Sequence, residues 1–142
     1  MVVDTSSLLA IFFNDEKGPA VARMLEANSM DLRMSTINLT ETLILLQDRQ
    51  PQLFEGLKAL LLGSNIRFVA PDPIQATIAA DARLRLPLNL GDCFAYALCK
   101  TEDCSLLTLD QDFKKTDLRL VEETGPGNCA FVGGHSLDRW YF

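Results

Sequence analysis

Acidic residues at the boundaries of expected secondary-structure elements are the groups in this 142-residue chain most suited to chemistry. Asp4 ends an apolar run at residues 1–3, and Asp110 ends another at residues 105–109. Glu41 and Asp92 each lie near the start of an expected helix. Oxygen ligands without histidine or cysteine select hard cations such as Mg²⁺ or Mn²⁺. These ions activate water and stabilise charge on a phosphate, so converging carboxylates would indicate metal-dependent phosphate chemistry.

Each acid also has a purely structural explanation. Asp4 is a good helix N-cap, and Asp92 in a first helical turn is favoured by the helix dipole. Asp110 and Asp112 are turn formers, and Glu41 could lie on the exposed face of a helix. Singly, these explanations are the simpler ones. Together they require several acids to gather at one place by coincidence, which favours a site.

Short apolar runs alternate with helical patterns along the chain. This alternation predicts a parallel sheet covered by helices on both faces. The expected strands cover residues 1–4, 32–35, 66–70, 105–109 and 118–121. The expected helices cover residues 6–13, 20–27, 36–49, 52–62, 74–84 and 91–100.

A parallel sheet would bring most of the acids together. Its strands end at one edge, and ligands bind outside that edge in open α/β sheets. Asp4, Asp110 and Glu41 are therefore expected there. Asp92 begins the helix that leads into the fourth strand, and topology alone does not fix its place.

Composition limits the classes of function. An apolar content of 48% is ordinary for a globular protein of one domain. The net charge of −6 argues against a broad electrostatic grip on nucleic acid, although a bound cation would invert the charge locally. Apolar runs such as residues 43–46 are far shorter than the ~20 residues of a membrane span. Because no basic region precedes the first apolar stretch, we expect a cytoplasmic protein without a signal peptide.

The four cysteines give no pattern of a zinc site. No Cys-x-x-Cys pair occurs among Cys93, Cys99, Cys104 and Cys129, and His135 is the sole histidine. We therefore expect mostly buried thiols and no disulfides.

Four segments together resemble the PIN-domain family, and most closely the VapC-type ribonuclease toxins of bacterial toxin–antitoxin pairs. They are VVDTSSLLAIFFND, TINLTETLILL, LNLGDCFAYALCK and LLTLDQDFKKTDLRLV, within residues 1–121. The resemblance implies a three-layer α/β/α fold with a short-stranded parallel sheet. It also implies an endoribonuclease that cleaves RNA with Mg²⁺ or Mn²⁺, is a homodimer, and is inhibited by a small VapB-like antitoxin.

The resemblance also assigns roles to residues. The catalytic acids would be Asp4, Glu41, Asp92 and Asp110, with Asp112 as the alternative fourth metal ligand and Thr5 or Ser6 supporting the metal or a water. Basic residues near the site would hold the RNA backbone, with Arg33, Arg49, Lys114 and Lys115 as the candidates.

Two segments depart from the family's pattern. Residues 80–93 form a shorter loop than in many relatives, which leaves substrate preference open. The Gly-rich tail at residues 122–142 has no recognised counterpart, so the expected nuclease domain is 1–121.

Three other functions are weighed against the nuclease. A haloacid-dehalogenase-type phosphatase needs a second aspartate where Ser6 stands, and a receiver-type signalling module needs a phosphorylated aspartate where Asp72 fits poorly. A catalytically silent PIN-like binding module is the remaining alternative.

Overall fold

A parallel sheet of four short strands forms the centre of the computed structural model, which describes residues 1–123. The strand order is β3-β2-β1-β4, with β2 paired to β3 along its whole length and Val2 and Val3 opposite Leu106 and Leu107. The strands are β1 (Val2–Val3), β2 (Leu32–Ser35), β3 (Ile66–Val69) and β4 (Leu106–Leu107). The helices are α1 (Thr5–Phe12), α2 (Gly18–Ala27), α3 (Thr36–Arg49), α4 (Phe54–Leu62), α5 (Pro73–Arg85), α6 (Leu90–Glu102) and the 3₁₀ helix η1 (Gln111–Lys115).

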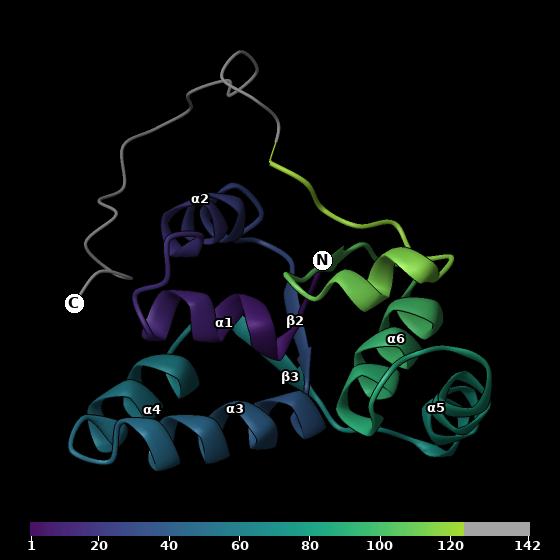
Figure 1. Ribbon diagram of the computed structural model, residues 1–142, viewed down its shortest axis with the longest axis horizontal. Helices are drawn as coiled ribbons and strands as arrows, with labels where there is room; N and C mark the ends of the chain where they lie inside the picture. The colour runs from purple at the N-terminus through teal and green to yellow at the C-terminus, as the bar shows by residue number, and fades with distance from the viewer. Residues whose placement is uncertain (124–142) are drawn as a thin grey trace.

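Helices cover both faces of the sheet (Figure 1). Because side chains alternate along a strand, Val3 packs against α1–α4 while Val2 packs against α5 and α6. Leu107 and Leu106 divide in the same way. The expected three-layer α/β/α architecture is therefore confirmed, with a separate hydrophobic core on each side of the sheet.

Most expected elements occur, and β2 and α3 have the predicted limits. The expected fifth strand at residues 118–121 is wrong, because only Leu120 makes a single parallel bridge, to Leu106. The helix expected at residues 91–100 begins earlier, because Asn89 accepts a hydrogen bond from the Asp92 N–H and caps it. Asp92 is therefore the third residue of α6 rather than the second.

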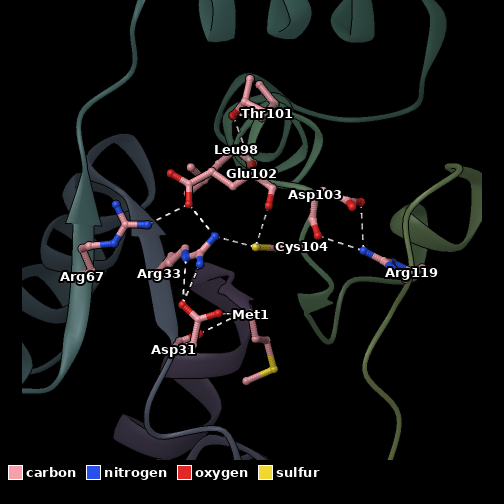
Figure 2. Close-up of polar contacts among 11 residues, drawn as sticks. Met1, Asp31, Arg33, Arg67, Leu98, Thr101, Glu102, Asp103, Cys104 and Arg119 are labelled. Atoms are coloured by element: carbon pink, nitrogen blue, oxygen red, sulfur yellow. Dashed lines mark hydrogen bonds and ion pairs between the residues drawn. The ribbon is translucent and has the colours of Figure 1, made fainter.

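The amino-terminal edge of the sheet is fastened by ion pairs (Figure 2). Arg33 of β2 contacts Glu102 at the end of α6 (2.5 Å) and Asp31 (2.7 Å). Arg67 of β3 reaches the same Glu102 carboxylate, and the Arg33 guanidinium also donates to the Cys104 sulfur. This network joins β2, β3 and α6 at the edge opposite the acidic residues.

Several other expectations concern parts of the chain away from the acids. Cys93 and Cys99 are buried, Cys104 is half-buried, and all three are free thiols. Within residues 1–123, no helix is long and apolar enough to cross a membrane. The Gly-rich tail lies outside the described residues from 124 onward, as does Cys129.

Two glycine substitutions test the packing of the helical layer. A Cβ on Gly18 would lie 2.7 Å from the Ala10 carbonyl oxygen, so Gly18→Ala must separate α2 from α1. A Cβ on Gly56 of α4 would meet nothing within 4 Å. We expect Gly18→Ala to lower the free energy of unfolding by about 1–3 kcal/mol. Gly56→Ala should raise it by about 0.5 kcal/mol through helix propensity.

Urea denaturation of both variants measures these changes. Equal stabilities of Gly18→Ala and Gly56→Ala would contradict the close packing of α1 on α2.

Candidate functional site

Asp4 is buried at the carboxyl ends of the strands, the edge of the sheet at which the acidic residues lie and which we call the acidic edge. It directly follows β1, caps α1, and is 1% exposed. Its Oδ2 accepts hydrogen bonds from the Ser6 hydroxyl (2.7 Å) and the Thr108 hydroxyl (2.9 Å). Its Oδ1 is buried and has no hydrogen-bond partner among the described residues. Burial raises the pKa of this carboxyl, and the hydroxyl donors oppose that rise.

The two hydroxyls that bind Asp4 are themselves fixed by the chain after β4. The Ser6 oxygen accepts from the Leu109 N–H (2.9 Å), and the Thr108 oxygen accepts from the Asp110 N–H (3.1 Å). Each hydroxyl therefore has its hydrogen committed to the Asp4 carboxylate. This arrangement holds the end of β1 against the segment that carries Asp110.

Glu41 is positioned by Thr5 and by the start of α6. The Thr5 hydroxyl donates to Glu41 Oε2 at 2.7 Å. A Cβ on Gly91 would lie 3.1 Å from the same oxygen, so the glycine leaves room for the carboxylate next to Asp92. The buried Asn38 side chain donates to the Gly91 carbonyl at 3.1 Å and so joins α3 to α6.

Asp92 lies at the acidic edge, where topology alone could not place it. It is buried in the first turn of α6, and its carboxylate accepts a long hydrogen bond from the Asn89 N–H (3.4 Å). Burial and then the charges of Asp4 and Asp110 raise the pKa of Asp92 to about 7, with a further contribution from Glu41. The charges of Asp4, Asp110 and Glu41 therefore all oppose ionisation of Asp92.

The structure distinguishes Asp110 from Asp112. The charge of Asp110 acts on Asp92, although its own carboxylate also caps η1 by accepting the Asp112 N–H at 2.8 Å. The Asp112 carboxylate instead pairs with Lys115 at 2.9 Å, and its side chain is 45% exposed. Asp110 is thus the better placed of the two to act with Asp4 and Asp92.

A divalent cation fits the chemistry of this site. Within residues 1–123, no three Asp, Glu, His or Cys side chains converge closely enough to form a ready-made metal site. The donors are all oxygens, the other acids repel the Asp92 carboxylate, and Asp4 Oδ1 is buried without a partner among residues 1–123. A hard cation drawn between the acids would relieve both the repulsion and the unpaired oxygen.

Of the basic residues expected near RNA, one lies away from the acids and another forms an ion pair. Arg33 belongs to the ion-pair network at the opposite edge of the sheet, and Lys115 is paired with Asp112. Arg49 lies over the Phe13 ring, 5.4 Å from its centroid. Lys114 lines a hollow together with Asp110, beside the acids.

Sequence reasoning missed three residues that position the acids: Asn38, Asn89 and Thr108. The Thr-x-Asp-x-Asp motif contains Thr108, so the motif could have signalled its role. Asn38 gave no such signal, because its value depends on contact between α3 and α6, which are far apart in the sequence.

Comparison with known proteins identifies the family of this chain. The family model described as PIN domain matches residues 1–118. The chain belongs to the PIN-domain family. A curated relative named Ribonuclease VapC, from Mycolicibacterium smegmatis, is 36% identical over 130 residues, covering 85% of this chain and 99% of the relative.

Solved structures show that the PIN fold is shared. The chain is similar to VapC20 of Mycobacterium tuberculosis, described as a sarcin-ricin loop cleaving toxin, with a TM-score of 0.74 and 19% identity. That match covers 84% of this chain and 97% of the other. The chain is also similar to DNA-bound VapBC from Salmonella typhimurium, with a TM-score of 0.67, 17% identity and coverage of 85% and 95%.

Replacing Asp92 in this PIN domain should stabilise the metal-free protein at neutral pH. Its pKa is about 7 when folded against a model value of 3.8, so ionising it opposes folding as the pH rises from about 4 to 7. Asp92→Asn removes that charge and keeps an acceptor for the Asn89 N–H. We expect a gain of about 1–2 kcal/mol at pH 7.5, shrinking toward pH 5, after allowance for solvent screening.

Denaturation in EDTA at both pH values measures this gain. The matched control is Asp112→Asn, which should change stability by no more than about 0.5 kcal/mol because its ion pair is exposed. A less stable Asp92→Asn protein at pH 7.5 would contradict the repulsion among the acids.

Proposed function

We propose that this protein is a VapC-type endoribonuclease that hydrolyses RNA phosphodiester bonds with Mg²⁺ or Mn²⁺. The observation that carries the proposal is that short contacts link the segments of Asp4, Glu41, Asp92 and Asp110 at one edge of the sheet. One buried Asp4 oxygen there has no hydrogen-bond partner among the described residues. The similarity to VapC ribonucleases over most of the chain supports the same function.

Each acid has a distinct task in the proposed site. Asp4, Asp92 and Glu41 would hold the cation, and Asp110 would hold it or orient the attacking water. When bound, the cation supplies the Lewis acidity that phosphodiester hydrolysis requires. Thr5 fixes the Glu41 carboxylate. Ser6 and Thr108 hold one oxygen of Asp4 and leave the other available.

A VapB-like antitoxin and a second copy of the chain are the proposed protein partners. The similarity to VapBC from Salmonella typhimurium supports the antitoxin. Helices α3 and α4 place Leu46, Leu57 and Leu61 in the core but leave Ile44 60% and Leu62 50% exposed. Exposed apolar side chains on adjacent helices favour a homodimer interface. A single-chain mass by light scattering at micromolar concentration would contradict the homodimer.

A silent PIN-like module is not favoured, because all four acids are present and each is held by at least one hydrogen bond. Cytoplasmic location is also part of the proposal.

The central prediction is metal-dependent cleavage of RNA. Protein freed of any antitoxin should cut mixed-sequence RNA with Mn²⁺, and EDTA should abolish cleavage. Asp92→Asn should reduce the rate by at least about 100-fold, because it removes a charged ligand from the cluster. Asp112→Asn should stay within about threefold of wild type, because Lys115 occupies that carboxylate.

Gel electrophoresis of end-labelled RNA measures these rates. No cleavage by folded, partner-free wild type would favour the silent module. Full activity of Asp92→Asn would remove Asp92 from the site, and loss of activity in Asp112→Asn would make Asp112 the fourth acid.

A further inference from the structure

Most of the basic side chains in the described part of this acidic protein form ion pairs. Eight of the twelve lysines and arginines within residues 1–123 pair with carboxylates: Arg23, Arg33, Lys58, Arg67, Arg85, Lys100, Lys115 and Arg119. In that part of the chain, the cations without such a pair are Lys17, Arg49, Arg83 and Lys114. An anionic ligand therefore has few free positive charges available to it.

Two of these free cations line the same groove, which opens at the acidic site. The groove has a volume of about 330 Å³ and lies between α2 and the chain on either side of η1. Lys17 and Lys114 line it together with Thr108 and Asp110. Because Thr108 donates to Asp4, the groove begins within one hydrogen bond of the buried acid.

A second hollow lies next to the groove. It has a volume of about 340 Å³, shares Lys17 and Leu109 with the groove, and reaches Ser6 and Phe13. A third free cation, Arg49, lies over the Phe13 ring. The fourth, Arg83, is on α5 and lines neither hollow. Lys17 and Lys114 are thus the two free cations that line hollows beside the acids, whereas Asp15 and Glu16 are the acidic residues of the second hollow.

The remaining walls of the groove suit a nucleotide rather than an isolated anion. Val21, Met24 and Leu109 give it apolar surface for a base or sugar. Its acidic members are Asp110, Glu122 and Glu123, of which Glu123 is paired with Arg23. Its volume is at the small end for ligand sites, about 300–1,000 Å³, which suits a single nucleotide. Lysine ammonium groups bind phosphate as mobile point charges.

We propose that Lys17 and Lys114 bind the backbone of single-stranded RNA at the phosphate next to the bond that is cut. This inference rests on the proposed ribonuclease function and adds the path of the substrate across the protein. The two lysines are positioning residues, because they hold the strand while the acids act on the scissile phosphate.

The test uses binding and cleavage together. Binding of a fluorescein-labelled single-stranded oligoribonucleotide is measured by anisotropy in EDTA, where metal-dependent cleavage does not proceed. Lys17→Ala and Lys114→Ala should each raise Kd about five- to tenfold, and each should reduce the salt dependence of binding by about 0.7 in the log–log slope. Lys17→Arg and Lys114→Arg should stay within about twofold of wild type, because they keep the charge.

Arg83→Ala is the matched control, because it removes an equally free charge away from the groove. With Mn²⁺, the two lysine-to-alanine variants should raise KM and leave kcat within about twofold of wild type. Arg83→Ala should change neither quantity.

The outcomes separate this inference from the function on which it rests. RNA binding that weakens in the lysine variants without any cleavage by wild type would overturn the ribonuclease and keep the groove. Cleavage with unchanged Kd and KM in both lysine variants would overturn the groove and keep the ribonuclease. Equal weakening in Arg83→Ala would reduce the effect to net charge and overturn the groove. Failure of the wild type both to bind RNA in EDTA and to cleave it with Mn²⁺ would overturn both.

Discussion

The mutual repulsion of carboxylates at the carboxyl edge of the sheet is the constraint on which the rest of the structure depends. Asp4 and Asp92 are both buried, and the charge of Asp4 helps to raise the pKa of Asp92. Such an arrangement persists only because surrounding groups hold it. Ser6 and Thr108 bind one Asp4 oxygen, and Thr5 binds Glu41. Neutral hydroxyl donors therefore fix the carboxylates in place, and in our proposal a bound cation neutralises their charge.

Helix capping explains how acids from distant parts of the chain are held at the same edge of a sheet of short strands. Asp4 caps α1, Asp110 caps η1, and Asp92 forms a capping box with Asn89 at the start of α6. The structural explanation of these residues therefore holds, and it is compatible with the cation-binding role that we propose for them. Three helices begin at one edge, and their N-terminal dipoles oppose part of the repulsion among the acids. The repulsion that remains lowers the free energy of unfolding, which is consistent with the usual trade-off between stability and activity at functional sites.

Local sequence determined much of the fold. Residues 32–49 carry a buried strand followed by a strongly periodic helix, and β2 and α3 have the expected limits. Residues 118–121 are apolar enough for a strand, yet they form a single bridge to β4, between Leu120 and Leu106, and β4 is itself just two residues long. Strand pairing depends on a neighbour of sufficient length, and that information is not local.

The acids were predictable from the sequence, whereas the contacts that organise them were not. Asp4, Glu41 and Asp110 follow from parallel topology, and Asp92 required the family resemblance. Asn38 and the separation of Asp110 from Asp112 depend on side-chain contacts across the fold. The basic residues were harder still, because Arg33 and Lys114 look alike in the sequence. One is bound in ion pairs at the far edge, and the other lines the groove beside Asp110.

Direct titration of Mn²⁺ into metal-free protein by isothermal calorimetry tests the central claim, that these four acids form a cation site. The account predicts saturable binding by wild type, weakened at least about tenfold in Asp92→Asn and unchanged in Asp112→Asn. Absence of saturable binding by folded wild type, or equal binding by wild type and Asp92→Asn, would contradict it.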